Sequence, residues 1–128
     1  MTFPIKTIDV KPRIPKVLNA LFDLSDNLWF VWNYEGSELF RRMNPDLWED
    51  TRRNPVEFLY RLQEQELRTL AQDEGFIAHL ERVKQEFQRY VSEKPGLGIF
   101  GEFKEPFQVA YFTAECGVAD CLPIYSGG

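Results

Sequence analysis

Apolar side chains recur at three- and four-residue steps in two stretches of this 128-residue chain. That spacing puts them on one side of an α-helix, and a helix with an apolar side must cover it by packing on a neighbour. The first stretch predicts a helix over about residues 15–32, and the second predicts the longest helix, opened by Asp73 and ending near Glu93. The repeating positions are Leu18, Leu21, Phe22, Leu28, Trp29 and Trp32, then Phe76, Leu80, Val83, Phe87 and Tyr90.

Asparagine marks the start of the shorter helices. We expect Asn33 to end the first helix and to cap a second one. Asn44-Pro45 and Asn54-Pro55 each combine a side chain that accepts from a free helical N–H with a proline whose missing N–H costs nothing at the first helical position. Helices should therefore start at both prolines, the second reaching about residue 63, with a further short turn over residues 66–71.

Prolines and glycines separate this helical region from the two ends of the chain. The residues before the first helix read as a short extended arm with at most one edge strand. Residues 94–106 read as a linker, because several glycines and prolines would break any helix there. Residues 107–112 are apolar at nearly every position, which predicts a strand buried on both faces of a parallel α/β sheet. We therefore predict a helical domain over residues 1–93 and the start of a truncated second domain over residues 107–128.

The chain ends in Gly127 and Gly128, which follow a strand-like run and a turn. Two glycines in that setting resemble the start of a loop that binds phosphate through backbone N–H groups, but such a loop needs more residues and a following helix. We expect this chain to be a piece of a larger protein.

Charge and cysteine content exclude several classes of function. The net charge is −5, and no segment clusters lysine and arginine with aromatic residues, so we expect neither nucleic acid nor a membrane surface as a partner. Polar residues interrupt the most apolar segment, and the N-terminus lacks the layout of a secretory signal, which predicts a cytoplasmic protein. Cys116 and Cys121 suit neither a redox pair nor a tetrahedral metal site, so free thiols and no metal are expected.

Two ordered strings of residues carry a family resemblance. The first comprises residues 27–33 and 38–49, and the second comprises residues 110–115 and 122–128. The first resembles the N-terminal helical region of prokaryotic α-glucan (glycogen and maltodextrin) phosphorylases, and the second resembles the start of their catalytic domain, which is of the GT-B type. The strings read NLWFVWN and ELFRRMNPDLWE, then AYFTAE and LPIYSGG.

The resemblance implies phosphorolysis, in which inorganic phosphate releases glucose 1-phosphate from an α-1,4-glucan with pyridoxal phosphate as cofactor. It implies that Glu115 lines the catalytic cleft and that Gly127 and Gly128 begin the phosphate-binding loop. The family's cofactor lysine lies beyond residue 128, so we expect no bound pyridoxal phosphate and no catalysis from this chain alone. The implied partners are the rest of the catalytic domain, the glucan and phosphate. Whether the full-length enzyme forms a homo-oligomer stays open.

A freestanding helical module that binds carbohydrate or protein is the alternative. Its sugar platform would use the aromatic residues, but aromatics at helical spacing are usually core. Trp29 and Trp32 are therefore predicted to be core, whereas Phe30 and Tyr34 are better placed to contact the catalytic domain. His79 is predicted to be solvated or at the rim of the core. The two arginine pairs, Arg41-Arg42 and Arg52-Arg53, are interpreted as surface ion pairs rather than phosphate ligands.

Overall fold

The computed structural model of the chain describes residues 13–93, 112 and 117–122. All regular secondary structure in those residues is helical, which confirms the prediction of a mainly α-helical region. The predicted extended arm lies almost wholly outside the described residues, as does the strand over residues 107–112, of which only Phe112 is described, outside any strand. The elements are the 3₁₀-helices η1 (Lys16–Leu18) and η2 (Leu28–Val31) and the α-helices α1 (Ala20–Ser25), α2 (Tyr34–Met43), α3 (Pro45–Asp50), α4 (Pro55–Arg61), α5 (Glu64–Leu70) and α6 (Glu74–Ser92).

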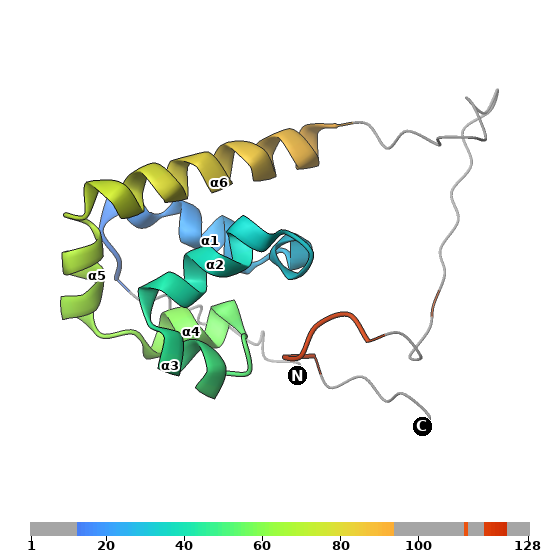
Figure 1. Cartoon of the computed structure of the whole chain (residues 1–128), viewed down its shortest axis with the longest axis horizontal. Coiled ribbons are helices and arrows are strands. Elements are labelled where there is room, and N and C mark those ends of the chain that lie inside the picture. Colours follow the sequence, from blue (N-terminus) through green and yellow to red (C-terminus); the bar gives the residue numbers. More distant parts are fainter. Residues whose placement is uncertain (1–12, 94–111, 113–116, 123–128) are drawn as a thin grey trace, which may run out of the picture.

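The helices stack in three tiers (Figure 1). The long helix α6 lies on one side, α1 and α2 form the middle, and α3 with α4 form the opposite side. Helix α5 lies at one end and connects α4 to α6. Because α1 contacts both α4 and α6, and α2 contacts both α3 and α6, the middle tier is covered on two sides.

The predicted single helix over residues 15–32 is wrong, because three short helices occupy that stretch. Asn27 is extended, with φ −126° and ψ 135°, and its side chain accepts a 2.8 Å hydrogen bond from the Trp29 backbone N–H. An asparagine that caps a new turn in this way competes with continuation of the helix before it. The break changes the direction of the residues that follow, and Trp32, predicted as core, is 59% exposed.

The predicted asparagine caps are confirmed. Asn33 accepts from the N–H of Gly36 at 2.8 Å and starts α2, Asn44 accepts from the N–H of Leu47 at 3.0 Å and starts α3, and Asn54 starts α4. Asp73 caps α6, which ends at Ser92, close to the predicted end. Each cap satisfies a helical N–H that has no partner within its own helix.

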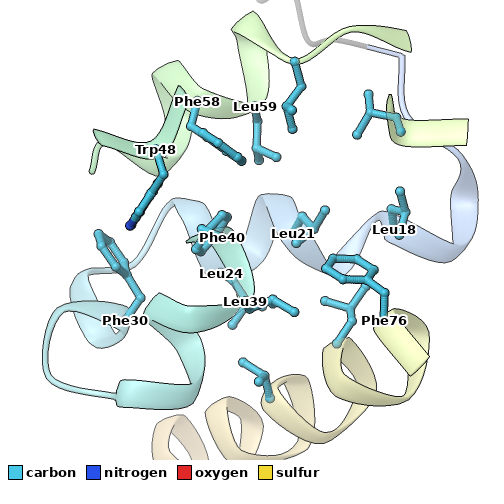
Figure 2. Packing of buried hydrophobic residues seen from close by; sticks show 14 of the residues in the cluster. Leu18, Leu21, Leu24, Phe30, Leu39, Phe40, Trp48, Phe58, Leu59 and Phe76 are labelled. Atoms are coloured by element: carbon cyan, nitrogen blue, oxygen red, sulfur yellow. The ribbon is translucent and has the colours of Figure 1, made fainter. Parts of the chain in front are cut away.

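Four aromatic rings form the centre of the core between the middle tier and α3–α4 (Figure 2). Phe40 and Trp48 stack with their centroids 5.3 Å apart and their planes 12° apart. Phe58 meets both rings edge-on, and so does Phe30. Offset and edge-on arrangements of this kind stabilise a core by more than the area they bury. Toward α6 the core continues through leucines and Phe76 (Figure 2).

Candidate functional site: the groove at the α3–α4 corner

A groove of about 390 Å³ opens between η2, the start of α2 and α3. Phe30, Val31 and Trp48 supply its apolar lining, and Ser37 and Arg53 add polar groups. Its remaining lining comes from far along the chain, in residues 117–120. The groove is thus the place where the helical region meets the described part of the C-terminal region.

The apolar lining of the groove belongs to the aromatic core. Phe30 is only 4% exposed and Trp48 only 1%, so both side chains are buried in the core that borders the groove. Phe30, predicted to be a better candidate than Trp29 or Trp32 for a contact with the catalytic domain, is instead part of the core. Its place one residue after Trp29 in η2, rather than in a longer helix, turns it inward against Phe40 and Trp48.

Charged side chains line the α3 side of the groove. The Arg53 guanidinium lies 3.2 Å from Glu49 on α3 and 3.3 Å from Asp120. The hydrogen bond and charge of Glu49 raise the pKa of Arg53 still further, so Arg53 is a fixed cation. The surface-pair interpretation of Arg52-Arg53 is therefore confirmed for Arg53, with the addition of a partner 67 residues away.

The backbone that connects α3 to α4, residues 51–54, is in an unusual conformation, and we call this connection the α3–α4 corner. Arg52 and Arg53 have φ values of 51° and 58°, in the left-handed region that costs an L-residue roughly 1–2 kcal/mol. The Arg52 N–H donates to the Glu49 carbonyl and the Arg53 N–H to the Trp48 carbonyl, both at 2.9 Å. This is the Schellman arrangement that ends many helices, usually with glycine in the left-handed position. Here arginine occupies that position.

Two exposed aromatic side chains, Trp32 and Tyr34, lie at the junction of η2 and α2. Tyr34, a predicted candidate for a contact with the catalytic domain, is 73% exposed, and Trp32 is exposed as well because of the helix break. Trp29 is buried as predicted and packs on the rings of Phe87 and Tyr90.

The single histidine lies away from the groove, between α2 and α6. His79 is 8% exposed, so the prediction of a solvated side chain is wrong, although the histidine does lie at the edge of the core. Its Nε2 lies 3.0 Å from Glu35 Oε2, an ion-pair distance without hydrogen-bond geometry. Arg82 also contacts that oxygen at 3.0 Å, and its hydrogen bond is the main cause that lowers the pKa of Glu35. The arrangement joins two helices and contains no nucleophile.

The site residues expected from the resemblance, Glu115, Gly127 and Gly128, lie outside the described residues. Cys121 is a free, half-buried thiol whose pKa is raised by burial, as expected for this cysteine, whereas Cys116 is not among the described residues. No group of potential metal ligands occurs within residues 13–93 and 117–122. Within the same ranges, no helix is long and apolar enough to cross a bilayer.

Sequence reasoning missed the groove. Arg53 was placed correctly at the surface, but nothing in a single sequence pairs it with Asp120. No residue within 51–54 signals the left-handed conformation of Arg52 and Arg53, because helices also end without it, as α4 does at the extended Leu62.

Comparison with known proteins identifies the family to which this chain belongs. A family described as a protein of unknown function, DUF3417, matches residues 14–122. A maltodextrin phosphorylase of Thermococcus litoralis is 34% identical over 93% of this chain, a glycogen phosphorylase of Aquifex aeolicus 35% over 88%, and one of Mycobacterium tuberculosis 33% over 97%. The chain spans only 14–16% of the length of these relatives and matches their N-terminal region. No solved structure matches the chain significantly.

Proposed function

We propose, because the chain belongs to the DUF3417 family, that it forms the N-terminal helical part of an α-glucan phosphorylase and packs on that enzyme's catalytic domain. The observation that carries this proposal is the uniform naming of the relatives, which are glycogen and maltodextrin phosphorylases matched over nearly the whole chain. The residue strings at 27–33, 38–49 and 110–115, which suggested the family from the sequence, lie within the matched residues 14–122.

In this proposal the parent enzyme transfers glucose from a glucan to inorganic phosphate and works in the cytoplasm. Glu115 lines its catalytic cleft, and Gly127 and Gly128 begin its phosphate-binding loop. The helical domain occupies residues 1–93, a linker follows over residues 94–106, and the catalytic domain starts at residue 107. A loop of backbone N–H groups before a helix N-terminus suits a phosphate dianion, which supports the role given to the two glycines.

The described lysines do not fit a pyridoxal phosphate site. An aldehyde cofactor needs a lysine that can lose its proton, and burial is what lowers a lysine pKa enough for that. Lys16 is exposed, and Lys84 is paired with Glu81 at 3.2 Å with 37% of its side chain exposed. The cofactor is therefore assigned to the rest of the parent enzyme, and no step of the reaction is assigned to residues 13–93.

The contribution of the helical domain is to cover and position the catalytic domain. Trp32 and Tyr34 support this role, because two large aromatic side chains left 59% and 73% exposed near each other in sequence are typical of a protein contact surface. They lie at the η2–α2 junction, whose Val31 and Ser37 line the groove against residues 117–120. The same end of the helical domain would thus contact residues 117–120, near the start of the catalytic domain, and also the rest of that domain.

The test compares the chain alone with the chain joined to a phosphorylase catalytic domain. With maltodextrin and phosphate we expect glucose 1-phosphate from the joined protein and none from the chain alone. Tyr34→Ala in the joined protein should lower its melting temperature more than in the isolated chain. Val91→Ala, a change at a 59% exposed side chain on α6, serves as the control and should affect both alike.

Two results would refute the proposal. Release of glucose 1-phosphate by the chain alone would show that the catalytic groups lie within it. Saturable binding of maltodextrin to the isolated chain, abolished by Trp32→Ala, together with an unchanged joined enzyme, would instead establish the freestanding carbohydrate-binding module.

A further inference from the structure

The α3–α4 corner has the features of a docking site for another segment. It holds two arginines in the left-handed region, and the groove beside it is lined on one side by core residues and on the other by residues 117–120. A second hollow of about 380 Å³ lies on the other side of the corner. Its lining combines Thr51, Arg52 and Asn54 with Asp120 and Cys121. Residues 117–121 therefore line two hollows at one helix end.

The corner is built around a buried threonine. Thr51 is 3% exposed, and its hydroxyl donates to the Leu47 and Trp48 carbonyls at 3.0 and 3.1 Å. Because the side chain of Thr51 is tied to α3, the chain must reverse within the next two residues to reach the Asn54 cap. The left-handed conformation of Arg52 and Arg53 makes that reversal, and it directs the Arg53 guanidinium to Glu49 on α3. Glu49 then holds the cation where Asp120 meets it.

Residues 117–122 form a turn that brings Asp120 to the α3–α4 corner. The Leu122 N–H donates to the Ala119 carbonyl at 3.0 Å, which closes a turn. Within this turn Ala119 and Cys121 are half-buried, whereas Asp120 is exposed and pairs with Arg53. The family match extends over residues 14–122, so it includes both the helices and this turn.

We propose that the Arg52–Arg53 corner is the docking site for residues 117–122 of the same chain, with Arg53 as the residue that holds Asp120. Strained backbone persists where the surrounding structure or a contact requires it, and such strain is a reason to look for a function. The occupant is defined by charge, since Asp120 completes a carboxylate–guanidinium–carboxylate series with Glu49 and Arg53. This inference goes beyond the phosphorylase role and does not depend on it, because every contact lies within this chain.

Cys121 provides the assay. The thiolate is the form that reacts with iodoacetamide, and burial raises the pKa of this thiol, so docking should slow alkylation. The measurement uses the complete chain with Cys116→Ser, which leaves one thiol. We expect Arg53→Ala and Asp120→Asn each to accelerate alkylation of Cys121 by up to about fivefold, the factor that corresponds to the roughly 1 kcal/mol upper range of an exposed ion pair.

Three comparisons make the result specific. The double variant should react no faster than either single variant, because both remove the same contact. Arg68→Ala is the matched control, since Arg68 pairs with Glu64 on α5 at 2.7 Å and the change in charge is the same. High salt should accelerate alkylation in the parent chain and have less effect in Arg53→Ala, because exposed ion pairs are screened.

Asp120→Asn lies outside the helices, so it tests the contact even if Arg53→Ala perturbs the corner. Because the charge of the neighbouring Asp120 also raises the pKa of the Cys121 thiol, each alkylation rate is divided by the rate of the same variant unfolded in urea, where that local charge effect remains. Equal alkylation rates in the parent chain and Asp120→Asn would overturn the proposal, and so would additive effects in the double variant. An alkylation rate that depends on protein concentration would show that a second copy supplies residues 117–122, which would also overturn docking within one chain.

Discussion

Replacing Asn44 by alanine removes two bonds at once. Its side-chain oxygen accepts from the Leu47 N–H at 3.0 Å and caps α3, while its Nδ2 donates to Glu66 on α5 at 2.7 Å. Loss of an N-cap costs about 1 kcal/mol. A hydrogen bond to a charged group is worth roughly 1.5–3 kcal/mol, and we take about 1 kcal/mol because both residues are only half-buried. We expect Asn44→Ala to lower the free energy of unfolding by about 2 kcal/mol.

Asn54 gives a matched comparison. It caps α4 through the N–H groups of Val56 and Glu57, both at 3.1 Å, and its side chain makes no bond to another helix in the described part of the chain. Asn54→Ala should therefore cost about 1 kcal/mol. Urea unfolding followed by tryptophan fluorescence measures both values, and equal slopes against urea would show that the two variants unfold from comparable states.

Aspartate separates the two contributions of Asn44. It keeps the capping oxygen, but it removes the donor and places a second carboxylate beside Glu66, so Asn44→Asp should destabilise while Asn54→Asp should be nearly neutral. Pairing Asn44→Ala with Glu66→Ala should show a coupling of about 1 kcal/mol. If Asn44→Ala costs no more than Asn54→Ala, the Asn44–Glu66 bond contributes nothing and the reasoning is refuted.

Three further changes test other parts of the structure. Trp48→Ala should cost about 3–5 kcal/mol, the range for a large buried ring, and urea unfolding followed by circular dichroism would contradict tight aromatic packing if the loss were below about 1 kcal/mol. Arg52→Gly should stabilise the chain by about 0.5–1 kcal/mol, because relief of the left-handed strain exceeds the flexibility that glycine adds to the unfolded chain; a lower melting temperature would contradict this. Glu35 has its pKa lowered by Arg82, so its contribution is present above the ordinary carboxyl pKa and is lost as pH falls through the folded value. The stability gap between the parent chain and Glu35→Gln should therefore narrow from pH 7 to pH 3, and a constant gap would argue against the pair.

Local signals in the sequence were enough for most of the helical architecture. Asn33, Asn44, Asn54 and Asp73 act through bonds to residues two or three positions away, so their caps can be read without knowing the fold. The long helix α6 was predicted nearly to its last residue because its apolar spacing is regular over 19 residues.

The sequence reasoning failed where two local signals competed. The apolar spacing over residues 15–32 fits one helix, but Asn27 offers its side chain to a backbone N–H and starts a new turn. The exposure of Trp32 follows from that break. The burial of His79 and the pairing of Arg53 with Asp120 depend on contacts between distant segments, which periodicity does not encode. The roles of Glu115, Gly127 and Gly128 stay predictions.

The brevity of the helices has a consequence for how this module is inherited. Apart from α6, each helix in the described residues has ten residues or fewer, below the roughly 12–15 residues at which an isolated helix becomes even marginal in water. A peptide cut from α3 or α4 should be unstructured, and melting of the module should be all-or-none. Recombination that splits such a module would leave two unfolded halves, so gene fusion and loss should move it only as a whole.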